Sequence, residues 1–137
     1  MSAANALLAA IHARLSADAT LAAMTGPGAI RDRLLPRPLL PAIVIGEVET
    51  RDHSTGTEPA EEHRVTIEVW SEAEGRRQAG EIAERVRALL HDAAPGIAGH
   101  ALVSLAHERT RTRRQPASRL FLAELRFRAV TEPVASP

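Results

Sequence analysis

The alternation of apolar and polar residues in HRVTIEVW, residues 63–70, constrains the fold more than any other stretch of the chain. Val65, Ile67 and Val69 point to one side of an extended chain and the residues between them to the other, which predicts a strand with one buried face. The segment that follows, residues 71–92, carries apolar residues at helical spacing and polar residues elsewhere. A half-buried strand followed by an amphipathic helix predicts a sheet covered by helices on one side.

The remaining periodic segments extend this pattern to the whole chain. We expect a helix over 3–15, a short helical turn over 18–24, and an extended, irregular segment over 31–41, where three prolines occur. Further strands are predicted over 42–49, 101–109 and 119–130. The predicted fold class is α+β, with an N-terminal helix, a β-hairpin, a central helix and a second β-hairpin. The four strands would form a mostly antiparallel sheet packed by helices, in an order that the pattern leaves open.

The length of 137 residues corresponds to one domain, which we place at 1–132, with a flexible C-terminal tail over 133–137. Cysteine is absent, so the chain has neither disulfides nor thiolate metal ligands. No apolar run approaches the roughly 18 residues that span a bilayer, and the N-terminus lacks the features of a signal peptide. We therefore expect a soluble protein without a membrane partner, made on the cytoplasmic side.

The carboxylates after the strand at 63–70 are the first candidate for chemistry. Ser71 and Glu74 match the capping-box spacing S-x-x-E, so we interpret them as a helix cap rather than a catalytic pair. The six histidines lack metal-ligand spacing, the glycines fit neither a phosphate loop nor a dinucleotide fingerprint, and no serine lies in a nucleophile elbow. The sequence thus predicts no enzyme, no cofactor, no metal site and no catalytic residue.

Charge is segregated along a chain whose formal net charge is zero. Six acidic residues and one arginine between positions 47 and 62 give a net charge of −5; the acids are Glu47, Glu49, Asp52, Glu58, Glu61 and Glu62. Five arginines and no acid between positions 109 and 119 give +5; they are Arg109, Arg111, Arg113, Arg114 and Arg119. Both segments fall largely on the predicted hairpin loops. They are solvated loops, complementary surfaces between identical subunits, or, for the arginines, a contact to a nucleic-acid backbone.

The order of several local features resembles a known family. VIGE (Val44–Glu47), the STGTE…EEH segment, VWSEAEGRRQA and LVSL (Leu102–Leu105) are similar to the small tail-completion proteins of siphophage-like particles. That family includes the tail terminators of gene transfer agents. The resemblance extends from Ala6 to Glu132. It consists of the order and spacing of these short segments rather than of a motif of catalytic or binding residues.

The resemblance implies a structural assembly protein that forms a ring, a hexamer in this family. Such a ring terminates the tail tube and joins the tail to the head connector. Implied partners are the tail tube protein, a head-connector or stopper protein, and DNA that passes through the lumen without specific binding. The implied location is the bacterial cytoplasm during assembly, and then the head–tail junction of the particle. The alternatives are another stopper or connector component, or, less favoured, a small nucleic-acid-binding module.

Overall fold

The computed structural model describes residues 2–32, 40–72, 76–117 and 119–134. Its elements, in chain order, are α1 (Ala3–Ser16), α2 (Ala19–Thr25), β1 (Ile30–Arg31), β2 (Ala42–Asp52), β3 (Glu61–Ser71), α3 (Arg77–Leu90), β4 (His100–Gln115) and β5 (Leu120–Pro133). The α+β class predicted from the sequence is confirmed.

The strands form one five-stranded sheet in the order β1-β2-β3-β5-β4. Every neighbouring pair is antiparallel except β1 with β2, where Ile30 and Arg31 lie parallel to Ile43 and Val44. The prediction of four strands is therefore wrong by one. The fifth strand has two residues, which is too short for an alternating pattern to reveal.

The strands are also longer than predicted. β2 and β3 together leave residues 53–60 as their connection, and β4 runs to Gln115, six residues past its expected end. These extensions are rich in charge, and they form strand because one face of the sheet is open to water. A charged side chain on that face does not oppose β structure.

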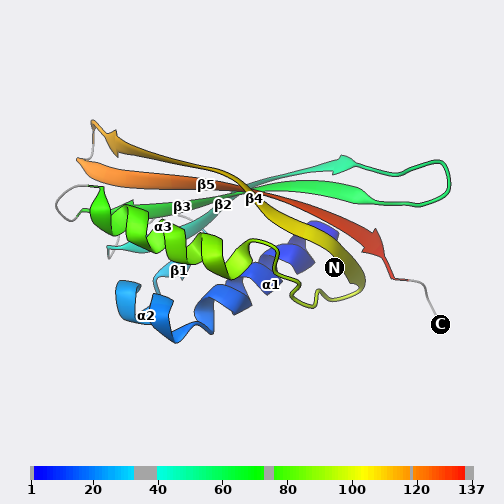
Figure 1. Cartoon of the computed structure of the whole chain (residues 1–137), viewed down its shortest axis with the longest axis horizontal. Helices are drawn as coiled ribbons and strands as arrows, with labels where there is room; N and C mark the ends of the chain where they lie inside the picture. The colour runs from blue at the N-terminus through cyan, green and yellow to red at the C-terminus, as the bar shows by residue number, and fades with distance from the viewer. Residues whose placement is uncertain (1, 33–39, 73–75, 118, 135–137) are drawn as a thin grey trace.

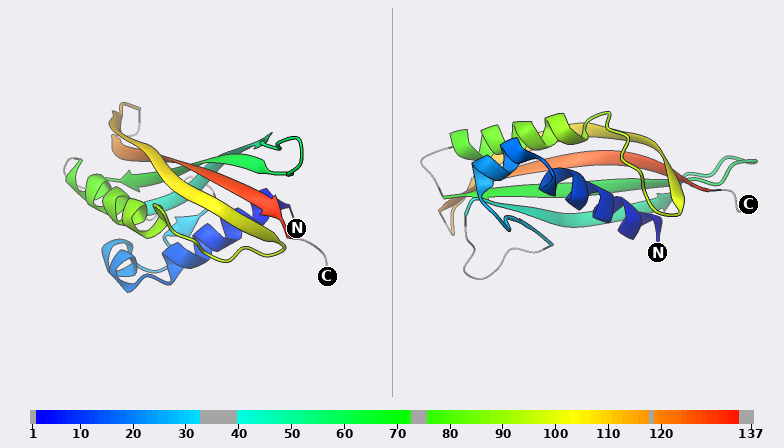
Figure 2. Two further views of the ribbon diagram at one scale, coloured as in Figure 1. Left: turned by 45° about the vertical axis from the view of Figure 1, so that its right-hand side comes forward. Right: turned by 90° about the horizontal axis from the view of Figure 1, so that it is seen from below.

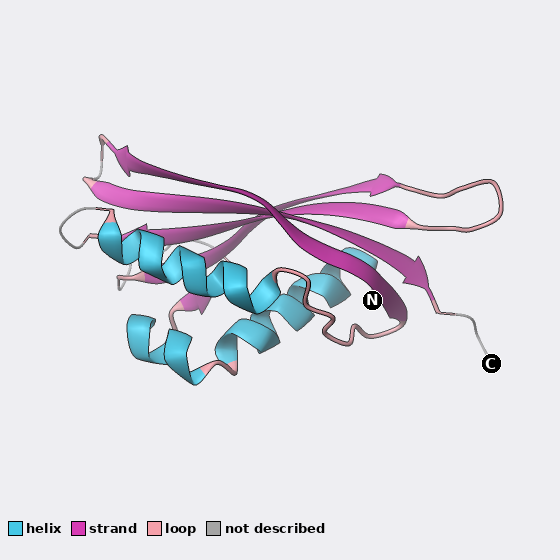
Figure 3. Cartoon of the chain, in the orientation of Figure 1, coloured by secondary structure: helices cyan, strands magenta, loops and turns pink. Residues whose placement is uncertain are grey.

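The helices α1, α2 and α3 cover the same face of the sheet (Figure 1, Figure 3). Between the two layers lies one core of Leu, Ile, Val and Ala side chains, with Phe127 its largest fully buried residue. Leu7 and Ile11 of α1 and Val86 of α3 are each 0% exposed. The alternation of β3 and the helical stripe of α3 meet in this core, as the sequence predicts.

Polar contacts fix how the helices begin and how they lie against one another. The Ser2 hydroxyl accepts a hydrogen bond from the Asn5 amide at 3.1 Å, and the Asp18 carboxylate accepts one from the Leu21 amide at 2.8 Å. Asp18 also pairs with Arg85 of α3 at 2.6 Å. One carboxylate therefore caps α2 and joins it to α3.

Ser71 does not have the capping role predicted for it. It is the last residue of β3 and fully buried, and its hydroxyl bonds to the side chain of Gln78. The helix starts six residues later, at Arg77, with Arg76 as its N-cap residue and without a side-chain cap. Because the strand continues through Ser71, its backbone is committed to the sheet. Glu74, the other half of the predicted cap, lies outside the described residues.

At the C-terminal end, β5 continues to Pro133, so the strand overlaps the start of the predicted flexible tail, of which residues 135–137 are outside the described part. Among the helices of the described residues, none combines the length and the apolar character needed to cross a membrane.

The one-sided core predicts different consequences for two adjacent leucines of α1. Leu7→Ala removes a fully buried side chain and should lower the free energy of unfolding by about 2–5 kcal/mol. Leu8→Ala is the matched control, because Leu8 is only partly buried at the edge of the core, and it should cost clearly less. Denaturant unfolding of both variants measures the difference, and equal losses would contradict the packing described here.

Candidate interaction surface

The structure places most of the predicted charged residues on strands rather than on loops. Glu47, Glu49 and Asp52 belong to β2, Glu61 and Glu62 to β3, and Glu58 to their connection. Arg109, Arg111, Arg113 and Arg114 belong to β4, and only Arg119 lies in the turn before β5, with a positive φ of 60°. The assignment of both charged segments to hairpin loops is therefore wrong, for the reason given above for the longer strands.

The two segments lie at opposite sides of the sheet. β4 forms one edge, and β2 lies at the other, where the two-residue β1 pairs only with its start. Strands β3 and β5 lie between β2 and β4 (Figure 2, right). The acidic residues of β2 and the arginines of β4 are therefore not brought together within one chain.

One predicted interface residue is instead neutralised inside the subunit. Glu62 accepts from Arg128 at 2.8 Å and from Arg64 at 3.1 Å, and its side chain is 14% exposed. These arginines, Arg128 first, hold the pKa of Glu62 below its usual range. Arg64 continues the network to Glu108 on β4 at 3.1 Å. This chain of pairs crosses the open face of the sheet and balances its charge there.

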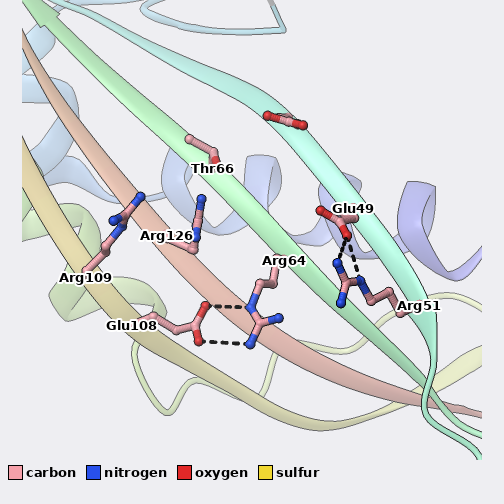
Figure 4. Close-up of a pocket in the computed structure, with 8 residues that line it drawn as sticks. Glu49, Arg51, Arg64, Thr66, Glu108, Arg109 and Arg126 are labelled. Carbon is pink, nitrogen blue, oxygen red and sulfur yellow. Dashed lines mark hydrogen bonds and ion pairs between the residues drawn. The ribbon is translucent and has the colours of Figure 1, made fainter.

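Next to this network lies a groove of 330 Å³ on the open face, lined by Glu47, Glu49, Arg51, Arg64, Thr66, Glu108, Arg109 and Arg126. In Figure 4, Arg64 turns toward Glu108, while Arg109 and Arg126 stand side by side. Arg109 and Arg126 are cross-strand partners, and neither forms an ion pair with any residue that the structure describes. Directly opposed like charges are unfavourable, so this pair leaves positive charge uncompensated by an ion pair among the described residues.

Arg64, Arg126 and Arg128 are not among the interface residues predicted from the sequence. The sequence did indicate that these three arginines lie on the solvent-exposed face, because each occupies a polar position of an alternating strand. Period-two alternation shows which face a side chain occupies, but not which strand lies beside it.

The edge arginines differ from the balanced centre of the face. No ion pair within the described part of the chain involves Arg111, Arg113, Arg114 or Arg119. On the other edge, Glu49 pairs with Arg51 at 2.7 Å, but both side chains are more than half exposed. Such exposed pairs contribute little and exchange partners readily. The two edges therefore carry charge that remains available to another molecule.

The hairpin of β2 and β3 extends beyond the helical layer (Figure 1) and is held by local bonds. At its tip, Ser54 donates from its hydroxyl and its amide to the Asp52 carboxylate, at 2.6 and 3.2 Å, which lowers the pKa of Asp52. At its base, His63 is fully buried and bonds to Thr50 and Thr131, both at 2.9 Å. His63 thus ties β2 and β3 to β5 where the hairpin leaves the core.

The described residues contain no group of three or more potential metal ligands.

Comparisons with known proteins agree with one another. The model of the family described as tail completion protein gp17 matches residues 9–132. Twenty chains of solved structures match significantly. One of them, a chain from a structure titled "Virion of native gene transfer agent (GTA) particle", is 32% identical and has a TM-score of 0.86; the match covers 96% of this chain and 98% of that one. A search of curated proteins found no significant match.

His63 predicts a pH dependence of stability. Burial lowers the pKa of His63 in the folded state, so on acidification the unfolded chain binds a proton at about 6.5 while the folded chain resists it. Stability from this residue is present above pH 6.5 and is lost as the pH falls below it. The stability advantage of the native protein over His63→Gln should therefore shrink between pH 7 and pH 5. Denaturant titrations at each pH measure this, with the exposed His53→Gln as the control; a constant advantage would contradict it.

Proposed function

This chain belongs to the tail completion protein gp17 family, and on that premise we propose that it is a tail terminator, a ring-shaped assembly protein that ends the tail tube and joins the tail to the head connector. Membership of this family establishes a structural role in the tail of a phage-like particle or gene transfer agent. The ring, its hexameric state and the termination of the tube are the proposal.

The observation that carries the proposal is the position of the charged segments. One sheet has an acidic strand at one side and a basic strand at the other. Surfaces that are complementary but not identical join copies head to tail, and such heterologous contacts close into a ring when the rotation allows. The candidate interface comprises Glu47, Glu49, Asp52, Glu58, Glu61, Arg109, Arg111, Arg113, Arg114 and Arg119. Glu62 is less suited to it, because Arg64 and Arg128 already bind its carboxylate.

The proposed partners follow from the ring. One face would bind the tail tube protein and the other a connector or stopper protein, while DNA passes through the lumen without specific binding. Assembly would take place in the bacterial cytoplasm, and the finished ring would lie at the head–tail junction of the particle. Nothing in this role requires catalysis.

Reversing the basic edge should separate assembly from folding. In Arg111→Glu/Arg113→Glu/Arg114→Glu, repulsion from the acidic edge of the next copy should block ring closure or tail docking. The monomer should stay folded, because these arginines make no ion pair with a described residue. Circular dichroism checks the fold, and light scattering together with particle yield checks assembly. Arg76→Glu/Arg77→Glu, on an exposed part of the helical layer, is the control. Normal particles from the triple variant would refute this interface.

Electron microscopy of particles from a deletion strain tests the function itself. A terminator predicts overlong tails or tails without heads, because polymerisation of the tube is not stopped. Filled heads that leak DNA would identify the chain as a stopper or connector component instead. Salt-dependent DNA binding by the purified protein, reduced in the arginine variant, would favour the nucleic-acid-binding module over both.

A further inference from the structure

The sheet has two strand edges that stay partly open among the described residues. Near its start β4 is covered: the Leu105 carbonyl accepts from the Asp92 amide at 2.8 Å, and the His107 amide donates to His91 Nδ1 at 3.0 Å. Beyond Glu108 no described strand lies outside β4, and β2 has no outer neighbour beyond Val44, where β1 stops. Open edges present unpaired amide and carbonyl groups and readily add another strand. In this chain they lie on opposite sides of one sheet, so they can bind each other only between copies.

Bulges restrict which parts of these edges can accept a regular strand. The pairing of β2 is irregular between Ile45 and Val48, and that of β4 is irregular near Val103 and Glu108. The regular parts that remain are Val48–Asp52 on β2 and Arg109–Gln115 on β4. They coincide with acidic residues on the first strand and with the arginines on the second.

We propose that Val48–Asp52 of one copy pairs with the Arg109–Gln115 edge of the next, so that the sheet continues from subunit to subunit. This contact rests on the ring proposed above. The direction follows from topology. β3 is antiparallel to β2, β5 to β3, and β4 to β5, so β4 runs opposite to β2. Copies placed side by side without turning over therefore meet as an antiparallel pair, the arrangement that the rest of the sheet uses.

Because side chains alternate between the two faces along each strand, the residue number then determines which side chains of the two copies share a face. Glu49 lies on the open face, opposite Arg64, and Arg111 lies on the same face, opposite Glu124. Thr50 and Thr110 lie on the other face, since their partners are His63 and Leu125. Odd-numbered residues of β2 thus face odd-numbered residues of β4. When Glu49 meets Arg111, Thr50 meets Thr110, and both are favourable cross-strand pairs. The same register places Arg51 opposite Arg109, an unfavourable pair, while Arg51 keeps its ion pair with Glu49 at 2.7 Å.

Charge also selects between this contact and a symmetric one. Two β4 edges paired with each other would place arginine rows from both copies together, and directly opposed like charges are destabilising. Pairing β4 with β2 instead places Glu49 and Asp52, with the single Arg51, beside one arginine row, so there is less repulsion than between two such rows. The edges therefore favour the heterologous contact, which suits a ring, over a two-fold dimer.

The pairing implies a stagger between neighbouring copies. Within one sheet Glu49 is level with Ala106, through Arg64 and Arg128. To reach Arg111, whose partner on β5 is Glu124 while that of Ala106 is Arg128, the next copy must move about four residues along the strands, roughly 14 Å at 3.4 Å per residue. β1 leaves room for this shift, because it covers only the start of β2. Closed sheets of tilted strands are built with such staggers.

Disulfide mapping tests the proposal on a chain that has no cysteine of its own. Opposed residues of an antiparallel pair have Cα atoms about 4.5–5.5 Å apart, within reach of a disulfide. Glu49→Cys/Arg111→Cys and Thr50→Cys/Thr110→Cys, which belong to the same register, should give a ladder of covalent oligomers after oxidation of the assembled protein. Glu49→Cys/Thr112→Cys places the thiols on opposite faces and should stay largely monomeric on non-reducing gels.

The outcomes separate the two proposals. Face-matched pairs that crosslink at least tenfold more than the mismatched control would support edge pairing. Oligomers that assemble but show no preference for face-matched pairs would overturn edge pairing, while the proposal of a ring would remain supported. Absence of any oligomer, in purified protein and in particles, would overturn both the ring and the contact within it.

Discussion

Burial of one face of the sheet under the helices is the constraint on which the rest of this structure depends. Because α1, α2 and α3 cover that face, the strands need an apolar residue at every second position along most of their length. Fully buried side chains such as Leu7, Ile67 and Phe127 satisfy this requirement in one continuous core. The alternate positions are then free to carry charge at little expense in stability. On the other face, Val44, Trp70 and Leu122 form a small buried cluster at one end of the sheet.

The distribution of charge on the open face separates a part that stabilises the subunit from a part that is left for other molecules. At the centre, Glu62 and Glu108 bind Arg64, and Glu62 also binds Arg128, so three strands are linked by compensated charge. Toward the β4 edge the arginines have no such partners among the residues described. A structural tail protein must combine a stable subunit with surfaces that bind its neighbours, and this division provides both.

Much of the fold could be predicted from the sequence because the informative patterns are local. The stripe of α3 and the alternation of β3 are each contained in a few turns or residues, and both were located correctly. The errors also have local causes. β1 is too short to produce a period, and Ser71 matches a cap motif whose backbone belongs to β3 instead. Strand ends at Asp52 and Gln115 were underestimated, because charge on an open face looks like a loop in sequence.

By itself, the sequence determined the α+β class, the helix-covered face of the sheet, the segregation of acidic from basic residues, and the family resemblance that the comparisons confirm. These properties depend on composition and on spacing along the chain. Only the tertiary structure decided that Glu49 and Arg111 lie on opposite sides of one sheet, and that Glu62 is bound internally while the arginines of β4 are not. Strand neighbours are chosen by backbone pairing between distant segments, which the order of side chains within either strand does not encode.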